Sequence, residues 1–130
     1  INMSAQVVTR SEAGASLTTG FAAMDNLAGA SVSSSFTVAS NVSSIKQVTI
    51  AVSGHAASDF VPLIKVSGNC MKDGDAVFTG PAFSMVTSGA SQSIFTYETD
   101  LAVQASNSCE ISIASTTAVT ADAAVTLTFA

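Results

Sequence analysis

Several segments of this chain alternate apolar and polar residues with a period of two. Successive side chains of a β-strand point to opposite faces, so this period indicates strands that are buried on one face only. Such a chain must cover its apolar strand faces with a second layer. The clearest apolar sets are Val48, Ile50 and Val52 within Ile45–Val52, Cys109, Ile111 and Ile113, and Val125, Leu127 and Phe129.

Shorter segments of the same kind recur about every 8–12 residues between turn-forming residues, a spacing typical of sandwiches and jelly rolls. Phe60–Val66 is one of them, and Pro62 favours a strand start or an edge position there. The Asp73-Gly74 pair is typical of a tight hairpin turn. We therefore predict an all-β fold, a single antiparallel β-sandwich or jelly roll of about eight strands, formed by residues 31–130. The remaining candidate strands are Gln6–Thr9, Ser35–Val38, Ala76–Thr79, Ser84–Val86, Ser93–Tyr97 and Leu101–Gln104.

Residues 1–30 follow a different pattern. The apolar residues Ile1, Met3, Ala5 and Val7 alternate with polar ones, which indicates an extended arm; with Val8, they are the candidate residues for contact with another subunit. Further on, apolar residues recur at helical spacing, and this favours one short amphipathic helix or a continuation of the extended arm. The helically spaced residues are Leu17, Phe21, Met24 and Ala28.

Low charge is the main clue to the surface. Only 10% of the residues are charged, against about 25% in an ordinary soluble domain. Serine and threonine replace the missing charge, and a neutral surface of this kind is poorly protected against self-association. We expect much of it to be covered by neighbouring copies; the alternative is a monomer with a neutral surface.

The net charge of −5 argues against nucleic-acid partners. The four basic residues, Arg10, Lys46, Lys65 and Lys72, are scattered, whereas a phosphate backbone requires clustered cations. No apolar run approaches the roughly 18–20 residues of a membrane-spanning helix, so we expect no membrane insertion. The chain begins at Ile1 rather than at methionine, which indicates a processed N-terminus or a trimmed chain.

Cys70 and Cys109 are the only two cysteines. An even count in a low-charge chain of extracellular character favours a disulfide between them. Two buried free thiols are the alternative. One histidine and two distant cysteines offer no metal-ligand spacing, so no metal and no cofactor are expected.

A search for catalytic motifs finds none, and we expect neither an enzyme nor a small-molecule substrate. His55 lies four residues before Asp59, and a loop histidine accounts for it better than a catalytic triad does. Asp73 and Asp75 flank a glycine, and a solvated turn explains them better than a glycosidase pair or a calcium site.

One order of segments resembles small β-sandwich virion proteins, the capsid and decoration subunits of viruses of bacteria or archaea. The likeness covers roughly residues 35–130. It implies a jelly-roll-like, non-catalytic subunit of a virus particle, located in the virion, with copies of itself and other virion proteins as partners. The segments that carry it are Phe36-Thr37-Val38, Val42–Ile45, Gln47–Val52, Ile64–Asn69 and Ala124–Phe129.

Two other classes fit the same residues. An extracellular or cell-surface filament subunit, such as a pilin, suits the disulfide and an N-terminal strand donated to the next subunit. An adhesin or carbohydrate-binding sandwich requires exposed aromatic rings, for which Tyr97 is the candidate.

Overall fold

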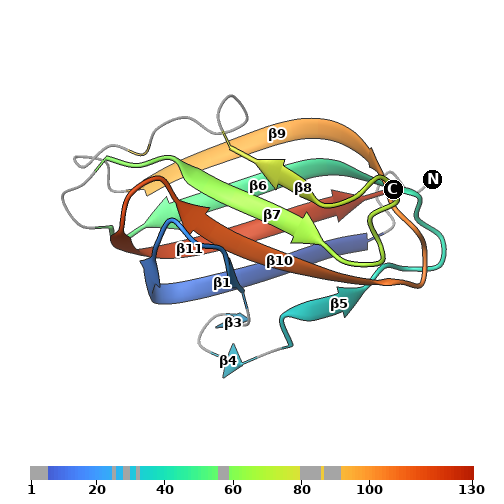
Figure 1. The fold of residues 1–130 in the computed structure, drawn as a ribbon, viewed down its shortest axis with the longest axis horizontal. Helices are drawn as coiled ribbons and strands as arrows, with labels where there is room; N and C mark the ends of the chain where they lie inside the picture. Colours follow the sequence, from blue (N-terminus) through green and yellow to red (C-terminus); the bar gives the residue numbers. More distant parts are fainter. Residues whose placement is uncertain are drawn as a thin grey trace.

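Two antiparallel β-sheets, packed face to face, form the protein (Figure 1). The structure is a computed structural model and describes residues 6–24, 26–27, 30–31, 33–55, 59–79, 86 and 92–130. The six-stranded sheet has the order β4-β3-β1-β11-β6-β9, and the five-stranded sheet contains β2-β10-β7-β8 with β5 also paired to β10. The strands are β1 (Gln6–Leu17), β2 (Ala22–Ala23), β3 (Asn26–Leu27), β4 (Ala30–Ser31), β5 (Ser35–Thr37), β6 (Ser44–Ser53), β7 (Pro62–Ser67), β8 (Ala76–Phe78), β9 (Gln92–Ala102), β10 (Ser108–Ser115) and β11 (Val119–Phe129).

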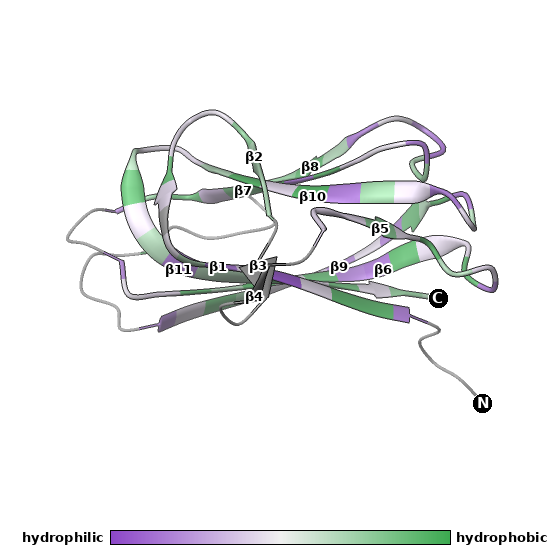
Figure 2. Ribbon diagram, turned by 90° about the horizontal axis from the view of Figure 1, so that it is seen from below, coloured by the Kyte–Doolittle hydropathy of each residue, from purple (hydrophilic) through white to green (hydrophobic). Residues whose placement is uncertain are grey.

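The residues that alternate in hydrophobicity along the sequence also alternate between buried and outward-facing positions in the structure. On β6 and β11, Val48 lies opposite Leu127 and Ile50 lies opposite Val125, and all four side chains are fully buried between the sheets. Thr49, between them, faces outward beside Thr126. Figure 2 shows the two layers edge-on. The predicted β-sandwich is therefore confirmed, and its long strands stand where the sequence placed them.

Local differences from the prediction concern strand number and ends. The described residues form eleven strands rather than about eight, three of them only two residues long. β1 is also longer than expected. The two short strands expected between Ser93 and Gln104 form one strand, β9. Pro62 begins β7, as a residue without an N–H requires. The strand expected at Ser84–Val86 lies mostly outside the described residues.

The expected helix around Leu17–Ala28 is wrong for the residues described there. Leu17 is the last residue of β1, and its side chain is buried. Met24, also buried, follows β2 and donates its backbone N–H to the carbonyl of Ile111. Phe21, between them, is 39% exposed. Ala28 lies outside the described residues. Leu17 and Met24 therefore enter the core from two different segments, and their helix-like spacing is coincidental. Gly14 and Gly20 also lower the helical propensity of this stretch.

The connection between β7 and β8 also differs from the tight turn expected at Asp73-Gly74. The two strands do pair, with Val66 opposite Ala76, but residues 68–75 form a longer loop between them. Cys70 in this loop is disulfide-bonded to Cys109 on β10, with the two Cα atoms 5.4 Å apart. Gly68, at φ +127°, passes so close to the carbonyl of Ser108 that a Cβ atom would clash with it. The covalent link and this close approach hold the chain in the wider path.

The described part of the chain contains no helix that is long and apolar enough to cross a membrane.

Candidate interaction site

One side of the sandwich is less completely closed than the rest. β9 is the last strand of the six-stranded sheet, and β8 is the last of the five-stranded sheet. β9 runs for eleven residues, whereas β8 has only three. Because so short a strand cannot cover so long a one, the inward face of β9 is only partly buried. Tyr97 is 38% exposed, although its partner on β6, Val48, is fully buried.

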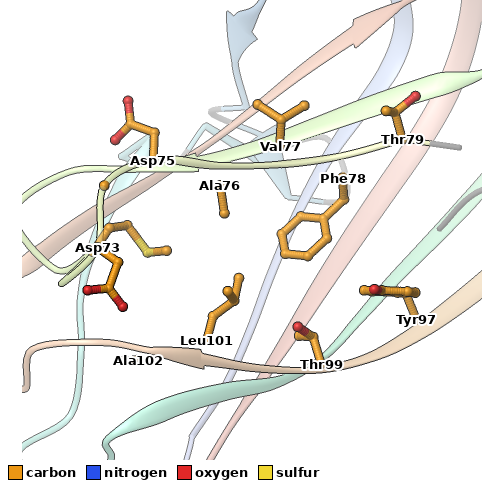
Figure 3. A pocket seen from close by; sticks show the side chains of 12 residues that line it. Asp73, Asp75, Ala76, Val77, Phe78, Thr79, Tyr97, Thr99, Leu101 and Ala102 are labelled. Carbon is orange, nitrogen blue, oxygen red and sulfur yellow. The ribbon is translucent and has the colours of Figure 1, made fainter. Parts of the chain in front are cut away.

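A cleft of about 430 Å³ lies between these two edge strands. Figure 3 shows Ala76 and Phe78 of β8 pointing across it toward Tyr97, Thr99 and Leu101 of β9. The rings of Phe78 and Tyr97 stand 5.9 Å apart at a tilt of 58°. We call this space the edge cleft; it is lined by Met71, Asp73–Thr79, Tyr97, Thr99, Leu101 and Ala102.

The chemistry of the edge cleft is mainly apolar. Phe78, Leu101 and Met71 supply its apolar surface, and Thr99 supplies a hydroxyl. The side chains of Asp75, Val77 and Thr79 point away from it (Figure 3). Among the described residues, no group of three or more histidine, cysteine or acidic side chains could hold a metal ion.

The end of the edge cleft nearest Met71 is firmly held. The Cys70–Cys109 disulfide joins this loop to β10, and the N–H of Gln104 donates to the carbonyl of Cys70 at 2.7 Å. Met71 forms a β-bridge with Val103, just beyond the end of β9. The loop therefore connects the two sheets at one end of the edge cleft.

The outward face of the six-stranded sheet carries a row of neutral hydroxyl side chains. Four threonines form one row across β1, β11, β6 and β9: Thr9, Thr126, Thr49 and Thr96. Their hydroxyls pair at 3.1 Å between β1 and β11 and at 3.3 Å between β6 and β9. Because these hydroxyls bond to one another, the row adds little demand for water or for a charged partner.

Three charged side chains near this row, Lys46, Asp100 and Glu98, form hydrogen bonds within the chain. Lys46 forms an ion pair with Asp100 at 2.9 Å, and Gln47 donates a hydrogen bond to Glu98 at 2.8 Å. The hydrogen bond from Lys46, together with its positive charge, lowers the pKa of Asp100 below its ordinary value of 3.8. Both side chains are exposed, so this pair is a surface feature with a small effect on stability.

The residues singled out in the sequence fall in different places. Cys70 and Cys109 form the expected disulfide. Ile1, Met3 and Ala5 lie outside the described residues. Val7 is 59% exposed on β1, and Val8 is buried in the core of its own sandwich. Residues 6–17, expected in the arm or helix segment, pair with β11 as a strand of the sheet.

The edge cleft was not predicted from the sequence. The feature that could have indicated it is the run Ala76-Val77-Phe78, which is apolar at all three positions and so does not alternate. Phe78 is buried while Val77 is 50% exposed, so this strand presents apolar surface on both faces. His55 packs edge-on against Phe60, with ring centroids 5.9 Å apart, away from this site.

Comparison with known proteins finds likeness at the level of fold. No family model and no curated protein matches the sequence. Among solved structures, PRD1 vertex protein P5 matches with a TM-score of 0.60 and 10% identity, over 98% of this chain and 99% of that chain. A chain in the structure of infectious bursal disease virus Gx strain matches with a TM-score of 0.50 and 10% identity. That match covers 96% of this chain but 33% of the viral one. The expected similarity to jelly-roll virion proteins is thus confirmed as a similarity of fold.

Proposed function

We propose that this chain is a non-catalytic structural subunit of a virus particle, a capsid or decoration protein that assembles with copies of itself and with other virion proteins. The observation that carries this proposal is the match to PRD1 vertex protein P5 over nearly the whole of both chains. A fold alone does not specify a function, so the surface must supply the rest of the argument.

The surface supports assembly in two places. The threonine row gives the six-stranded sheet a stretch of neutral surface, and beside it Lys46 and Asp100 are paired within the chain. The edge cleft leaves apolar side chains partly exposed beside β9, at one end of the six-stranded sheet; β3 and β4 lie at the other end. Apolar surface left uncovered in a subunit is typical of a protein–protein contact.

The N-terminal residues are the proposed connector between subunits. Ile1, Met3 and Ala5 alternate with polar residues, and Val7 projects from β1 with 59% of its surface exposed. Val8, which is buried within its own subunit, serves the fold. The disulfide suits a particle that persists outside the cell, where thiols are not kept reduced.

An extracellular filament is the second candidate, and the position of β9 at the end of its sheet, among the described strands, favours it. A strand donated to that edge joins subunits head to tail, and the contact builds a filament if its rotation does not close. A carbohydrate-binding role has less support, because the Tyr97 ring packs against Phe78 rather than standing clear of the surface.

The test is electron microscopy of the native source, with gold-labelled antibody raised against this chain. We expect label on the surface of spherical particles. Label along filaments would replace the virion proposal with the filament one. Label on dispersed single subunits alone would overturn both, because each requires assembly.

A further inference from the structure

We propose that Asn41 is a site of N-glycosylation, at which an oligosaccharide is attached to the side-chain amide. The segment Asn41-Val42-Ser43 matches the acceptor pattern, asparagine followed after one residue other than proline by serine or threonine. A pattern this short also arises by chance in a chain rich in serine, so its place in the fold must carry the argument. The inference goes beyond the proposed function, because it concerns a covalent modification of the subunit rather than its assembly.

The acceptor asparagine lies at the tip of a turn. Residues 38–43 connect β5 to β6, and the N–H of Val42 donates to the carbonyl of Ala39 at 3.3 Å, which closes a four-residue turn. Ser40 and Asn41 are the two central residues of this turn, and both are exposed. Val42, the next residue, is only 4% exposed. The turn is therefore anchored in the core by Val42 and presents Asn41 to solvent.

Both ends of the turn are fixed to the rest of the sandwich. On one side, the N–H of Ala39 donates to Oε1 of Gln6 at 2.9 Å. On the other, the N–H of Ser43 donates to the carbonyl of Ala130 at 2.9 Å, and the carbonyl of Ser43 accepts from the N–H of Val103 at 2.9 Å. The turn lies at the end of the sandwich where the C-terminus lies (Figure 1). An oligosaccharide at the exposed tip would extend from this end, so no strand and no core side chain would have to move.

Two other properties of the chain suit this modification. The Cys70–Cys109 disulfide is typical of a protein that passes through an oxidising compartment, and asparagine-linked sugars are likewise added to secreted chains. Only 10% of the residues are charged. An attached oligosaccharide is bulky and hydrophilic, so it would supply solubility that surface charge supplies in other proteins.

The transfer forms one bond and breaks one. Nδ2 of Asn41 bonds to C1 of the first sugar, and the bond between C1 and a phosphate oxygen of the donor, a lipid-linked oligosaccharide diphosphate, breaks. The lipid diphosphate leaves, and Nδ2 gives up one proton to a base of the transferase. The transferase recognises the acceptor through the hydroxyl at the third position of the pattern, which Ser43 supplies.

Two other asparagines delimit the proposal. Asn69 is also exposed, but Cys70 and Met71 follow it, so the required hydroxyl is absent and we expect Asn69 to be unmodified. Asn2-Met3-Ser4 repeats the pattern but lies outside the described residues, and the proposal does not include it.

Mass spectrometry of the chain purified from its native source tests the proposal. Trypsin cleaves after Arg10 and Lys46. Asn41 therefore falls in the peptide 11–46, separate from Asn2. We expect this peptide to carry an added mass of whole sugar residues, and electron-transfer fragmentation to place that mass on Asn41. An unmodified peptide 11–46, or sugar located only on its serines or threonines, would overturn the proposal.

Three variants expressed in the same host form the matched controls. Asn41→Gln keeps an amide but lengthens the side chain, and Ser43→Ala removes the hydroxyl, so both should lose the sugar from peptide 11–46. Ser43→Thr keeps a hydroxyl and should retain the sugar. Circular dichroism should show native secondary structure in all three, because both positions are exposed. Sugar retained in Ser43→Ala, or lost equally in Ser43→Thr, would contradict recognition of this site.

Discussion

The centre of the sandwich and its β8–β9 side are built from the same alternating pattern, yet they differ in burial. Leu127 on β11 is fully buried, whereas Leu101 on β9 is only partly buried. Both leucines point inward from the same six-stranded sheet. What differs is the position in the sheet, since β11 is flanked by β1 and β6 whereas β9 is the last strand. An inward direction is therefore set by the strand's own sequence, but the degree of burial also depends on the neighbouring strands.

The largest expected effect comes from comparing two leucine truncations. Leu127→Ala should lower the free energy of unfolding by about 4 kcal/mol, because it removes a fully enclosed side chain and leaves a cavity. Leu101→Ala should cost only about 1 kcal/mol, since part of its surface already contacts water. Urea unfolding of the dispersed chain measures both. Equal losses would mean that the edge cleft is as well packed as the centre.

Removing the disulfide should have the next largest effect. Cys70 and Cys109 are separated by 39 positions, and closing such a loop stabilises a fold by about 3–4 kcal/mol in the chain-entropy picture. We expect the double variant Cys70→Ala, Cys109→Ala to unfold at a lower temperature by calorimetry. Reductant should lower the melting temperature of the native chain but not that of the variant. A variant as stable as the native chain would show that the bridge does not constrain unfolding.

The smallest effect concerns the ion pair on the outward face of β6 and β9. The bond from Lys46 holds the pKa of Asp100 below 3.8. A carboxylate with a lowered pKa contributes stability above its unfolded value, and that contribution is lost as the pH falls through the folded value. Lys46→Met should therefore lower stability slightly at neutral pH, and its difference from the native chain should shrink as the pH falls below about 4. Unfolding measured from pH 2 to 7 tests this; a difference that grows as the pH falls would be inconsistent with it.

The centre was predictable from the sequence because its information is local. Val48, Ile50 and Val52 alternate with Gln47, Thr49 and Ala51, and a strand buries all three on one face while turning Thr49 to the other. The disulfide was predictable from cysteine count and surface composition. The Leu17–Met24 stretch was misread, since two residues that reach the core by separate turns have the same spacing as one helical face.

The edge cleft could not be predicted, because it depends on a missing partner rather than on a pattern. The residue types at positions 97, 99 and 101 carry no information about the length of the strand that faces them, β8. The wide path of residues 68–75 likewise depends on the distant Cys109 and Ser108, so the local Asp73-Gly74 signal did not decide it.

Hydrogen–deuterium exchange of the chain before and after assembly tests the central claim, that copies join through the β8–β9 side. A contact there would shield the backbone of β9 from solvent and slow its exchange. We predict increased protection over Gln92–Ala102 on assembly, with β11 equally protected in both states. Exchange over Gln92–Ala102 that is unchanged by assembly would contradict the account.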